Sequence, residues 1–577
     1  MSMEKFVSRR IAIAILTAGL AFTANAQVPS SASSAAAPPP IIAPAASSSV
    51  AAAPAPPAAD DPVAQAIYAR MQQMTPIGGG PLPRSEVTLG KAVGDFYAQR
   101  HYTAAWTDKT NVDQLLAGLR SMDTDGLNPE DYSLSQLTSL RDGLDPANAS
   151  PTQKAEFDVL ATTTYITSLV QLARGKVDPV SLDATWNFDP VAIDPQQGMS
   201  MIQTAIEERS IDQVYAMARP QNTLYTSLRD GLARMRDIAA KGGWPTLTDG
   251  PVLKSGMTDA RVGALRTRLV AGGYLDPTLA SGNTFDSPLT DAVKRFQADQ
   301  YLDADGSVGA STVAAMNVPV QQRIEQIRVN LERARWLLHE LQGTFVVVDI
   351  AGYKISFYRD GKPVWRSRVQ VGKPYRSTPI FRSQITYITF NPTWTVPPTI
   401  LKNDILPKVR QNPAYLANNR IRALNGSGQV VPVSSVDWNN PRGITLRQDA
   451  GPGNSLGRVV IRFPNSFSVY LHDTPHQEMF ALQKRDTSSG CIRVEKPLEL
   501  VQLLFNDDTK WNRAAIDDRI AAGKTQNVTL PASVPVLLAY WTVDIADDGH
   551  IAFKPDVYSR DQPLLQALDR PPPVKLP

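Results

Sequence analysis

The 577-residue chain contains one cysteine, Cys491, in the segment that follows His472. A thiol attacks a carbonyl carbon as its thiolate, and a nearby imidazole can accept the thiol proton or stabilise the thiolate as an ion pair. The segment between the two residues is long enough for a strand to end, pass through a loop and return beside itself. We therefore predict that folding brings the two side chains together, with Cys491 as a nucleophile and His472 as its general base.

A lone cysteine also has less reactive interpretations. With no second thiol for an internal disulfide, it is an inert buried thiol, half of an intermolecular bridge, or a nucleophile. Its neighbours, Ser488-Ser489-Gly490 before and Ile492-Arg493-Val494 after, favour the nucleophile. Gly490 lets a substrate carbonyl approach the backbone closely. The N–H groups of Gly490 and Cys491 are therefore predicted to bind a developing oxyanion.

Six further side chains are candidates for substrate contacts. A guanidinium fork such as that of Arg493 suits a carboxylate, although an arginine beside a strand is as often solvated or held in a structural ion pair. For Trp394, groove lining and core packing are equally good interpretations. The full set of predicted substrate-binding residues is Tyr470, Asp473, Thr474, Ser489, Arg493 and Trp394.

The orientation of the imidazole and the identity of the base each have an alternative. Asp473 follows His472 directly, but neighbours on a strand point to opposite faces. A backbone carbonyl is therefore at least as good a candidate to orient the ring. His476, four residues further on, is a second candidate base, which geometry must decide.

Other chemistries lack the residues they need. The histidines His101, His339 and His550 are scattered without the spacing of zinc ligands. The stretch 303–306 is similar to part of a calcium loop, but the closing ligands do not follow. We find no serine-hydrolase elbow motif. We therefore expect neither a metal nor a cofactor, and the net charge of only +3 gives no reason to expect nucleic acid as a partner.

The N-terminus has the pattern of an export signal. Lys5, Arg9 and Arg10 precede a short apolar run, which ends at Ala24-Asn25-Ala26. We expect residues 1–26 to be a cleaved signal peptide, with the mature protein in the periplasm and without a membrane span; an uncleaved anchor is the alternative. Residues 27–62, rich in Ala, Pro and Ser, are predicted to be a semi-extended linker.

Residues 63–245 have apolar positions at helical spacing. Val112, Leu115, Leu116 and Leu119 form one such set, and the stretch 157–172 forms another. The region is therefore predicted to be an α-helical domain. No group of residues within it has the spacing of a catalytic site.

Residues 246–320 are predicted to form a small helical unit of their own. Ala292-Val293-Lys294-Arg295-Phe296-Gln297, followed by the loop Asp305-Gly306-Ser307-Val308-Gly309, resembles the three-helix peptidoglycan-binding domain. A wall-binding role follows from this resemblance, because the apolar spacing by itself predicts only a core. A linking helix is expected over 321–342.

From residue 343 the pattern changes to the alternation typical of strands. Strands are predicted over 344–350, 364–371, 385–390, 458–463 and 467–471, with a further one around Tyr353, Ile355 and Phe357. A proline-punctuated insertion at 397–440 has helical spacing and suits a lid over a site. We assign 343–510 to one mainly β domain, with 511–577 as its C-terminal extension and a strand over 534–544.

This domain resembles the YkuD-type catalytic domain of L,D-transpeptidases. The matching motifs are Val371-Gly372-Lys373 with Thr378-Pro379, then His472-Asp473-Thr474, then Ser489-Gly490-Cys491-Ile492-Arg493. Many family members have histidine where this chain has Ser489. The order of domains is similar to that of the large periplasmic members. The expected fold class is thus multidomain α+β: an α-helical scaffold domain, a three-helix binding domain and a mainly β catalytic domain with a helical lid insertion.

The resemblance implies an acyl transfer on peptidoglycan stem peptides. Cys491 would form a thioester with a donor tetrapeptide and expel the terminal D-alanine, with His472 as acid and base. An amine of a second stem would then complete a 3→3 cross-link. The alternatives are hydrolysis or D-amino-acid exchange at the same thioester, and a non-catalytic wall-binding scaffold.

Overall fold

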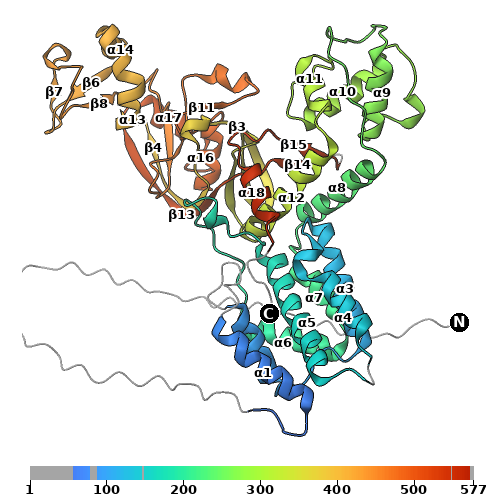
Figure 1. Ribbon diagram of the computed structural model, residues 1–577. Helices are drawn as coiled ribbons and strands as arrows, with labels where there is room; N and C mark the ends of the chain where they lie inside the picture. Colours follow the sequence, from blue (N-terminus) through green and yellow to red (C-terminus); the bar gives the residue numbers. More distant parts are fainter. Residues whose placement is uncertain (1–55, 78–87, 146–147, 547–548, 572–577) are drawn as a thin grey trace, which may run out of the picture. The chain divides into compact units, whose positions relative to one another are not determined.

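The computed structural model describes residues 56–77, 88–145, 148–546 and 549–571 (Figure 1). The predicted signal peptide and most of the predicted linker lie outside these residues. Within the part described, no helix combines the length and the apolar character needed to cross a membrane.

The first folded region is α-helical, as its apolar spacing predicts. Its longest helix, α5 (Pro151–Arg174), begins with a capping box in which Ser150 and Gln153 satisfy each other's backbone N–H groups. Small and apolar residues on most sides of this helix let it lie in the middle of the region. The other α-helices are α1 (Pro62–Ile77), α2 (Leu89–Gln99), α3 (Lys109–Ser121), α4 (Leu134–Gly143), α6 (Pro195–Glu208), α7 (Ile211–Ala218) and α8 (Thr223–Ala240); short 3₁₀ turns are η1 (Met122–Asp125), η2 (Pro129–Tyr132) and η3 (Pro179–Ser181).

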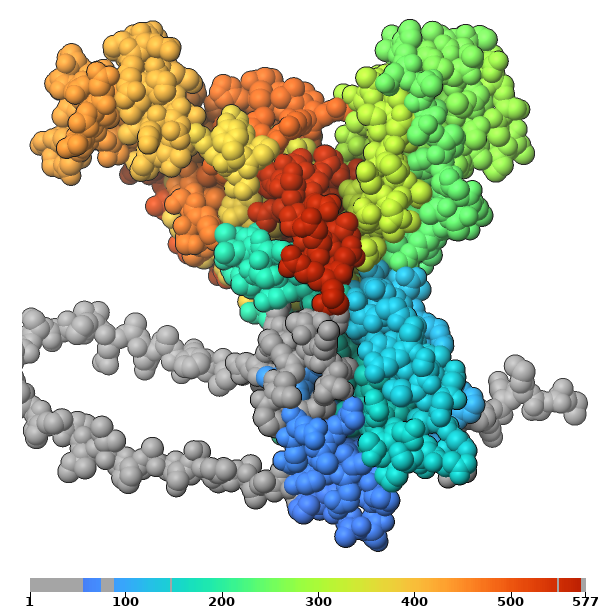
Figure 2. All heavy atoms as spheres, in the orientation of Figure 1, coloured from blue at the N-terminus to red at the C-terminus, as the bar shows by residue number. Residues whose placement is uncertain are grey.

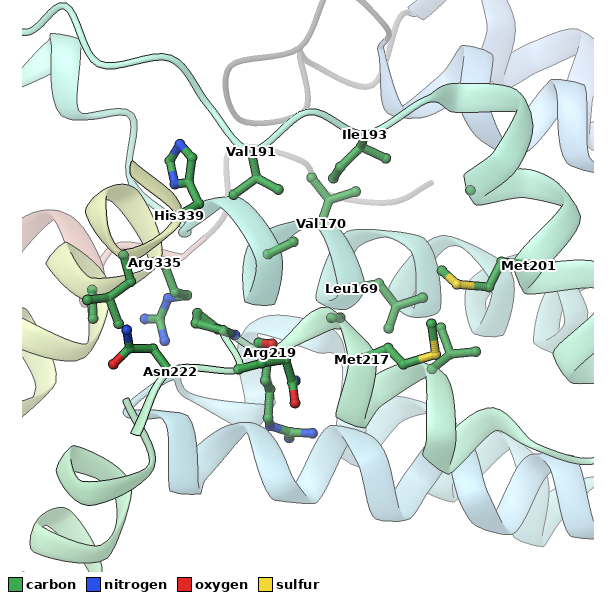
Figure 3. Close-up of a pocket in the computed structure, with 18 of the residues that line it drawn as sticks. Leu169, Val170, Val191, Ile193, Met201, Met217, Arg219, Asn222, Arg335 and His339 are labelled. Carbon is green, nitrogen blue, oxygen red and sulfur yellow. Dashed lines mark hydrogen bonds between the residues drawn. The ribbon is translucent and has the colours of Figure 1, made fainter. Parts of the chain in front are cut away.

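A mainly apolar cavity of about 540 Å³ lies between these helices and the later segment 334–342 (Figure 3). Leu169 and Val170 of α5, Met201 of α6 and Met217 of α7 line it. Neither Cys491 nor His472 is among the lining residues, so this cavity is separate from the predicted site.

The small helical unit has its own core. Val262 and Leu265 on one helix pack with Val293 and Phe296 on another, as the spacing predicts. The unit's elements are α9 (Arg261–Ala271), η4 (Pro277–Leu279), α10 (Ser287–Asp299) and α11 (Ala310–Met316); the linking helix α12 (Val320–Leu337) and the turn η5 (Leu338–Glu340) follow.

The β region is built on a nine-stranded sheet in the order β11-β3-β12-β10-β9-β4-β13-β1-β2, in which β2 also pairs with β3. The C-terminal extension supplies β13, which lies between β4 and β1 and is parallel to β1. The extension is therefore an interior part of the sheet. The strands are β1 (Phe345–Asp349), β2 (Lys354–Arg359), β3 (Lys362–Gly372), β4 (Phe381–Phe390), β9 (Val459–Arg462), β10 (Leu471–His472), β11 (Asp486–Ser488), β12 (Ile492–Val494) and β13 (Gln526–Ala539).

Shorter elements connect and cover these strands. The last of them, the helix α18 near the C-terminus, is drawn in red in Figure 2. They are η6 (Pro374–Arg376), η9 (Gln477–Ala481), α16 (Pro497–Phe505), α17 (Arg513–Ala521), the hairpin of β14 (Val543–Ile545) and β15 (Ile551–Phe553), and α18 (Asp561–Leu568).

One strand is much shorter than predicted. The pattern at 467–471 predicts a strand, but only Leu471 of that stretch is in β10. Asn465 accepts hydrogen bonds from the N–H groups of Phe467 and Val469, and Ser468 has a left-handed φ of 57°. This side-chain turn replaces the ladder hydrogen bonds that a strand would make.

The insertion is helical at its start, as predicted, but it also contains a second sheet. Its four strands have the order β5-β8-β6-β7, and the insertion packs its own core around Val409, Leu416 and Leu446. This sheet continues past residue 440, because its strand β8 ends at Gln448. The elements are β5 (Trp394–Thr395), α13 (Pro398–Ile400), the π-helical η7 (Leu401–Ile405), α14 (Leu406–Gln411), α15 (Ala414–Asn418), β6 (Ile421–Leu424), β7 (Val430–Val431), η8 (Val433–Ser435) and β8 (Thr445–Gln448).

Candidate active site

His472 ends strand β10, and Cys491 directly precedes β12, the parallel neighbour of β10. His472 is in register with Arg493, and Leu471 is in register with Ile492. Side chains in register point to the same face of a sheet, and successive side chains alternate. His472 and Arg493 therefore share one face, while Leu471 and Ile492 lie on the other. Cys491 directly precedes β12, and alternation extended by one residue puts its side chain on the face of His472.

The thiol of Cys491 is half-buried and held by the chain around Tyr470. Its Sγ donates to the carbonyl oxygen of Ser468 at 3.7 Å, and Tyr470 hydrogen-bonds the sulfur through both backbone and side chain. Burial raises the pKa of this thiol; Tyr470 and the positive charges of Arg493 and Arg462 oppose that effect only in part. The neutral thiol is therefore the main form at neutral pH, and a base is needed to activate it.

The imidazole of His472 is 4% exposed, and burial followed by the charge of Arg493 lowers its pKa to about 3. Nδ1 donates to the carbonyl oxygen of Asp473 at 2.5 Å. Hydrogen bonds to the carbonyls of Asp473 and Leu456 favour the protonated ring but do not outweigh burial. The ring is thus neutral at neutral pH, and its Nε2 has a lone pair to accept a proton.

The two groups share a face on adjacent strands, but the described contacts of the sulfur do not include the imidazole. The sulfur contacts Ser468 and Tyr470, and the imidazole contacts Asp473, Leu456 and the ring of Tyr470. Hydrogen bonds between catalytic groups are often long before substrate binds. The base and nucleophile roles stay predictions, which this shared face supports.

The loop before the cysteine has an unusual backbone. Gly490 has φ of 115°, a conformation that other residues rarely adopt. Its N–H donates to the hydroxyl of Ser488 at 3.1 Å, and that hydroxyl donates to the carbonyl oxygen of Cys491 at 2.6 Å. Of the two predicted oxyanion donors, the Gly490 amide thus already has an acceptor. No described residue accepts the Cys491 amide, which makes it the more available donor.

Three residues from outside this loop hold it in place. The hydroxyl of Thr378 donates to the carbonyl oxygen of Gly490 at 2.9 Å and accepts the N–H of Gly372 at 2.9 Å. Tyr558 donates through its hydroxyl to the carbonyl oxygen of Gly372 at 2.6 Å and accepts the N–H of Thr378 at 3.1 Å. The peptide that leads into Cys491 is therefore fixed by buried hydrogen bonds.

Two arginines, Arg493 and Arg462, lie around the thiol and the imidazole. Arg493 donates to the amide oxygen of Gln370 at 3.2 Å, and no carboxylate of the described residues pairs with it. Arg462 lies over the ring of Tyr470, 4.6 Å from its centroid. The Nε atoms of both arginines are buried without a hydrogen-bond partner. The site thus has positive charge available for an anionic group of a substrate.

Asp473 and Thr474 are buried behind the imidazole. The carboxylate of Asp473 pairs with Arg458 at 2.6 Å, whereas its backbone carbonyl orients His472. The hydroxyl of Thr474 accepts the N–H of His476 at 3.2 Å. These contacts support the strand end that carries the imidazole, and a substrate contact for either residue stays a prediction.

Ser489 and Trp394 have different surroundings. The hydroxyl of Ser489 is exposed and accepts a hydrogen bond of 2.9 Å from Arg376. Trp394 is half-buried and packs against the core of the insertion. Core packing therefore accounts for this tryptophan, and a role in the substrate groove stays a prediction.

The other histidines lie in ordinary surroundings. His476 is exposed, with Nδ1 3.4 Å from a carboxylate oxygen of Glu478. His339 and His550 contact backbone carbonyls. Among the residues that the structure describes, no group of three or more His, Cys, Asp and Glu side chains is placed to hold a metal ion.

Comparison with known families identifies three parts of the chain. The model of the L,D-transpeptidase catalytic domain matches residues 343–509. The chain contains an L,D-transpeptidase catalytic domain. A scaffold domain matches residues 91–232, and a "Putative peptidoglycan binding domain" matches residues 258–316. The arrangement confirms the predicted family and multidomain α+β class.

The matches to individual relatives cover only part of this chain, and the match to the curated relative also covers only part of that relative. A "Putative L,D-transpeptidase" of Haemophilus influenzae is 34% identical over 243 residues, which are 42% of this chain and 49% of the relative. The chain thus spans about half the length of that curated relative. An L,D-transpeptidase structure from Xylanimonas cellulosilytica is 15% identical with a TM-score of 0.18, covering 51% of this chain and 100% of that one. An L,D-transpeptidase structure from Stackebrandtia nassauensis is 13% identical with a TM-score of 0.20, and the match covers 51% of this chain and 96% of that one.

Some residues of the transpeptidase domain's site were not predicted from sequence. Gly372 and Thr378 matched the family motif, yet only the structure shows that they hold the loop before Cys491. Arg376 lies in the same stretch, and its contact with Ser489 depends on how two loops meet. Arg462 had no sequence signal, because only the strand register places it beside Tyr470.

Proposed function

We propose that this protein is an L,D-transpeptidase that forms 3→3 cross-links between peptidoglycan stem peptides through a thioester at Cys491. The observation that carries the proposal is the shared sheet face of Cys491 and a neutral, oriented His472 inside a transpeptidase domain. An α-helical scaffold domain and a peptidoglycan-binding domain accompany it. We place the mature protein in the periplasm, because its N-terminus has the pattern of an export signal.

In the first half-reaction the donor is a tetrapeptide stem. His472 accepts the thiol proton as Sγ of Cys491 attacks the carbonyl carbon of the third residue. The amide of Cys491 stabilises the negative charge that develops on the carbonyl oxygen. The bond to the terminal D-alanine then breaks, and His472 returns the proton to the leaving amine. A thioester remains on the enzyme.

In the second half-reaction an amine is the nucleophile. The side-chain amine of diaminopimelate on a second stem attacks the thioester carbon, and His472 accepts the amine proton. As the carbon–sulfur bond breaks, the proton passes to the sulfur and regenerates the thiol. The product is an amide between two third-position residues.

Water can replace the amine and would convert the reaction into hydrolysis, and a free D-amino acid would give exchange. We propose that the insertion acts as a lid that limits access of water to the thioester. A purely wall-binding scaffold is the remaining alternative, in which Cys491 has no chemical role.

Mass spectrometry of stem peptides tests these alternatives. Sacculi are treated with the wild-type protein, with Cys491→Ala and with His472→Gln, and muropeptides are then analysed. New 3→3 dimers that are lost in both variants support the proposal. Shortened or exchanged stems without dimers would replace it by hydrolysis or exchange. If the wild-type protein binds the wall but leaves the muropeptides unchanged, only the hypothesis of a non-catalytic wall-binding scaffold would remain.

A further inference from the structure

Arg376 connects the insertion to the loop that carries the nucleophile. It is the last residue of η6, in the connection between β3 and β4. Its Nη1 donates to the hydroxyl of Ser489 at 2.9 Å and to a carboxylate oxygen of Asp404. Asp404 belongs to the insertion, and Ser489 lies two residues before Cys491. One guanidinium thus contacts both sides of the site.

The position of this guanidinium relative to the nucleophile is set by a short chain of backbone contacts. The N–H of Arg376 donates to the carbonyl oxygen of Lys373 at 2.8 Å. The N–H of Lys373 donates to the carbonyl oxygen of Ser488 at 3.0 Å. Gly372 packs so closely that an added Cβ would lie 2.1 Å from the carbonyl oxygen of Arg376 and 3.0 Å from Cα of Gly490. Arg376 is therefore anchored to the nucleophile loop independently of Asp404.

The partner in the insertion is held less firmly. The side chain of Asp404 is 41% exposed, compared with 15% for Arg376. An exposed carboxylate gains little from an ion pair, because water and salt screen it. Another carboxylate of better geometry can therefore replace it on the guanidinium at small cost, since the exchange leaves the charge of the pair unchanged.

A second feature marks the same place. Asp404 lies in η7, a π-helical segment of five residues. Such segments are rare, and within α-helices they often occur at functional sites. The face of the guanidinium is bordered by Tyr375, whose ring centroid is 5.7 Å from Cζ of Arg376 and whose side chain is largely exposed. The neighbouring charges are Lys373, which also lies near Tyr375, and Asp404 itself.

We propose that Arg376 is a carboxylate-binding residue for the donor stem peptide, and that Asp404 occupies it until the substrate displaces it. The inference rests on the proposed function, because it takes the stem peptide as the ligand. Arginine is suited to this role, since its planar fork binds carboxylates through two parallel hydrogen bonds. Exchange of Asp404 for the substrate would also free the insertion from the nucleophile loop as the donor binds.

A panel of donor tetrapeptides tests the ligand. Each member has one carboxylate converted to its amide, and formation of the thioester at Cys491 is followed by mass spectrometry. In the wild type we expect one member to lose about tenfold in kcat/KM, as the loss of a charge-assisted hydrogen bond predicts. In Arg376→Gln that member and the unmodified donor should react equally, and Arg376→Lys should recover part of the difference.

Asp404→Asn tests whether this residue occupies the site. Removal of the competing carboxylate should lower KM for the unmodified donor by about two- to fivefold, the range of an exposed ion pair. Arg422→Gln is the matched control, because Arg422 pairs with Asp449 at 2.6 Å within the insertion and does not contact Ser489. It should leave the donor preference unchanged.

Two results would overturn the inference. An equal loss for every donor in Arg376→Gln, with unchanged thermal unfolding, would reduce Arg376 to a positioning residue. A higher KM in Asp404→Asn would remove the displacement step. Both results differ from failure of the proposed function, in which the wild type itself would form no thioester with any donor.

Discussion

The hydroxyl of Thr378 donates a hydrogen bond of 2.9 Å to the carbonyl oxygen of Gly490, 112 residues further along the chain. Thr378 is fully buried, and its oxygen also accepts the N–H of Gly372. One side chain therefore satisfies two backbone groups and fixes the peptide that leads into Cys491. The peptide before Cys491 is thus positioned by a residue to which we assign no chemical step.

Thr378→Val should destabilise the protein and slow thioester formation. Valine has nearly the same shape but leaves a buried carbonyl and a buried N–H without partners, which costs roughly 1–3 kcal/mol. Urea unfolding and the rate of thioester formation measure the two effects. Thr267→Val, at an exposed position in α9, is the control and should change stability by less than about 0.5 kcal/mol. Equal effects of both substitutions would contradict the role of Thr378.

Gly372→Ala should displace the nucleophile loop. The added Cβ would lie 2.1 Å from the carbonyl oxygen of Arg376, and backbone must move to relieve that contact. We expect thioester formation to fall by more than the loss of stability explains. Gly426→Ala is the matched control, because its Cβ would meet nothing within 4 Å. Retention of wild-type activity by Gly372→Ala would show that the loop tolerates this movement.

The fold class could be predicted from sequence because the apolar period differs between the regions. Helical spacing at 112–119 and alternation at 353–357 each report a buried face, and both were confirmed. The place of β13 between β4 and β1 was not predictable, because strand order depends on contacts between distant segments. The turn at Asn465 was also missed, since a side chain that replaces ladder hydrogen bonds leaves the alternation of residues unchanged.

The site was predictable only where chemistry restricts the residue type. Cys491 and His472 were singled out because few residue types act as nucleophile or base. The register puts them on one face only when it is extended by one residue, and their roles stay predictions. Arg376 and Arg462 were not, because arginine is common on protein surfaces and only tertiary contacts distinguish these two. The ion pair of Asp473 likewise depends on the packing of β9 against β10.

His472 should make stability depend on pH in the acid range. Its pKa is lowered to about 3 by burial, against an ordinary value of 6.5. Between these pH values the unfolded chain binds more protons than the folded one, so stability rises with pH. The stabilising effect of the neutral ring is complete above pH 6.5 and is lost progressively as pH falls toward 3.

Urea unfolding at several pH values measures this contribution. Between pH 6.5 and pH 5 the wild type should lose roughly 1.5–2 kcal/mol that His472→Gln does not lose, apart from effects of other groups common to both proteins. The comparison with the variant removes the carboxylate contributions. Parallel curves for the two proteins would show that the imidazole is protonated as easily in the folded state as in the unfolded state.

Glu332 and Arg335 form a buried ion pair within α12, both with fully buried side chains. Glu332 also accepts the N–H of Val177 at 2.7 Å. Glu332→Ala removes the carboxylate that pairs directly with this buried guanidinium and should cost about 3–5 kcal/mol in urea unfolding. Asp237→Ala breaks the exposed pair of Asp237 with Lys241 and should cost less than about 1 kcal/mol. A small loss in the first variant would mean that water enters the site.

Arg462 should help to ionise the thiol of Cys491. Its guanidinium lies over Tyr470, its charge lowers the pKa of Cys491, and its Nε has no partner in the described structure. Arg462→Gln removes that charge, so the thiol pKa should rise and less thiolate should be present at a given pH. The rate of alkylation by iodoacetamide, measured across pH, should therefore fall several-fold at pH 8 and recover at higher pH.

The control for this experiment is Arg422→Gln, which removes a guanidinium from the insertion and should leave the alkylation profile in place. A general loosening of the site would speed alkylation at every pH, because it exposes the sulfur. Loss of the charge instead displaces the whole profile to higher pH at an unchanged plateau. An unshifted profile in Arg462→Gln would leave Tyr470 and Arg493 as the groups that oppose the effect of burial on Cys491.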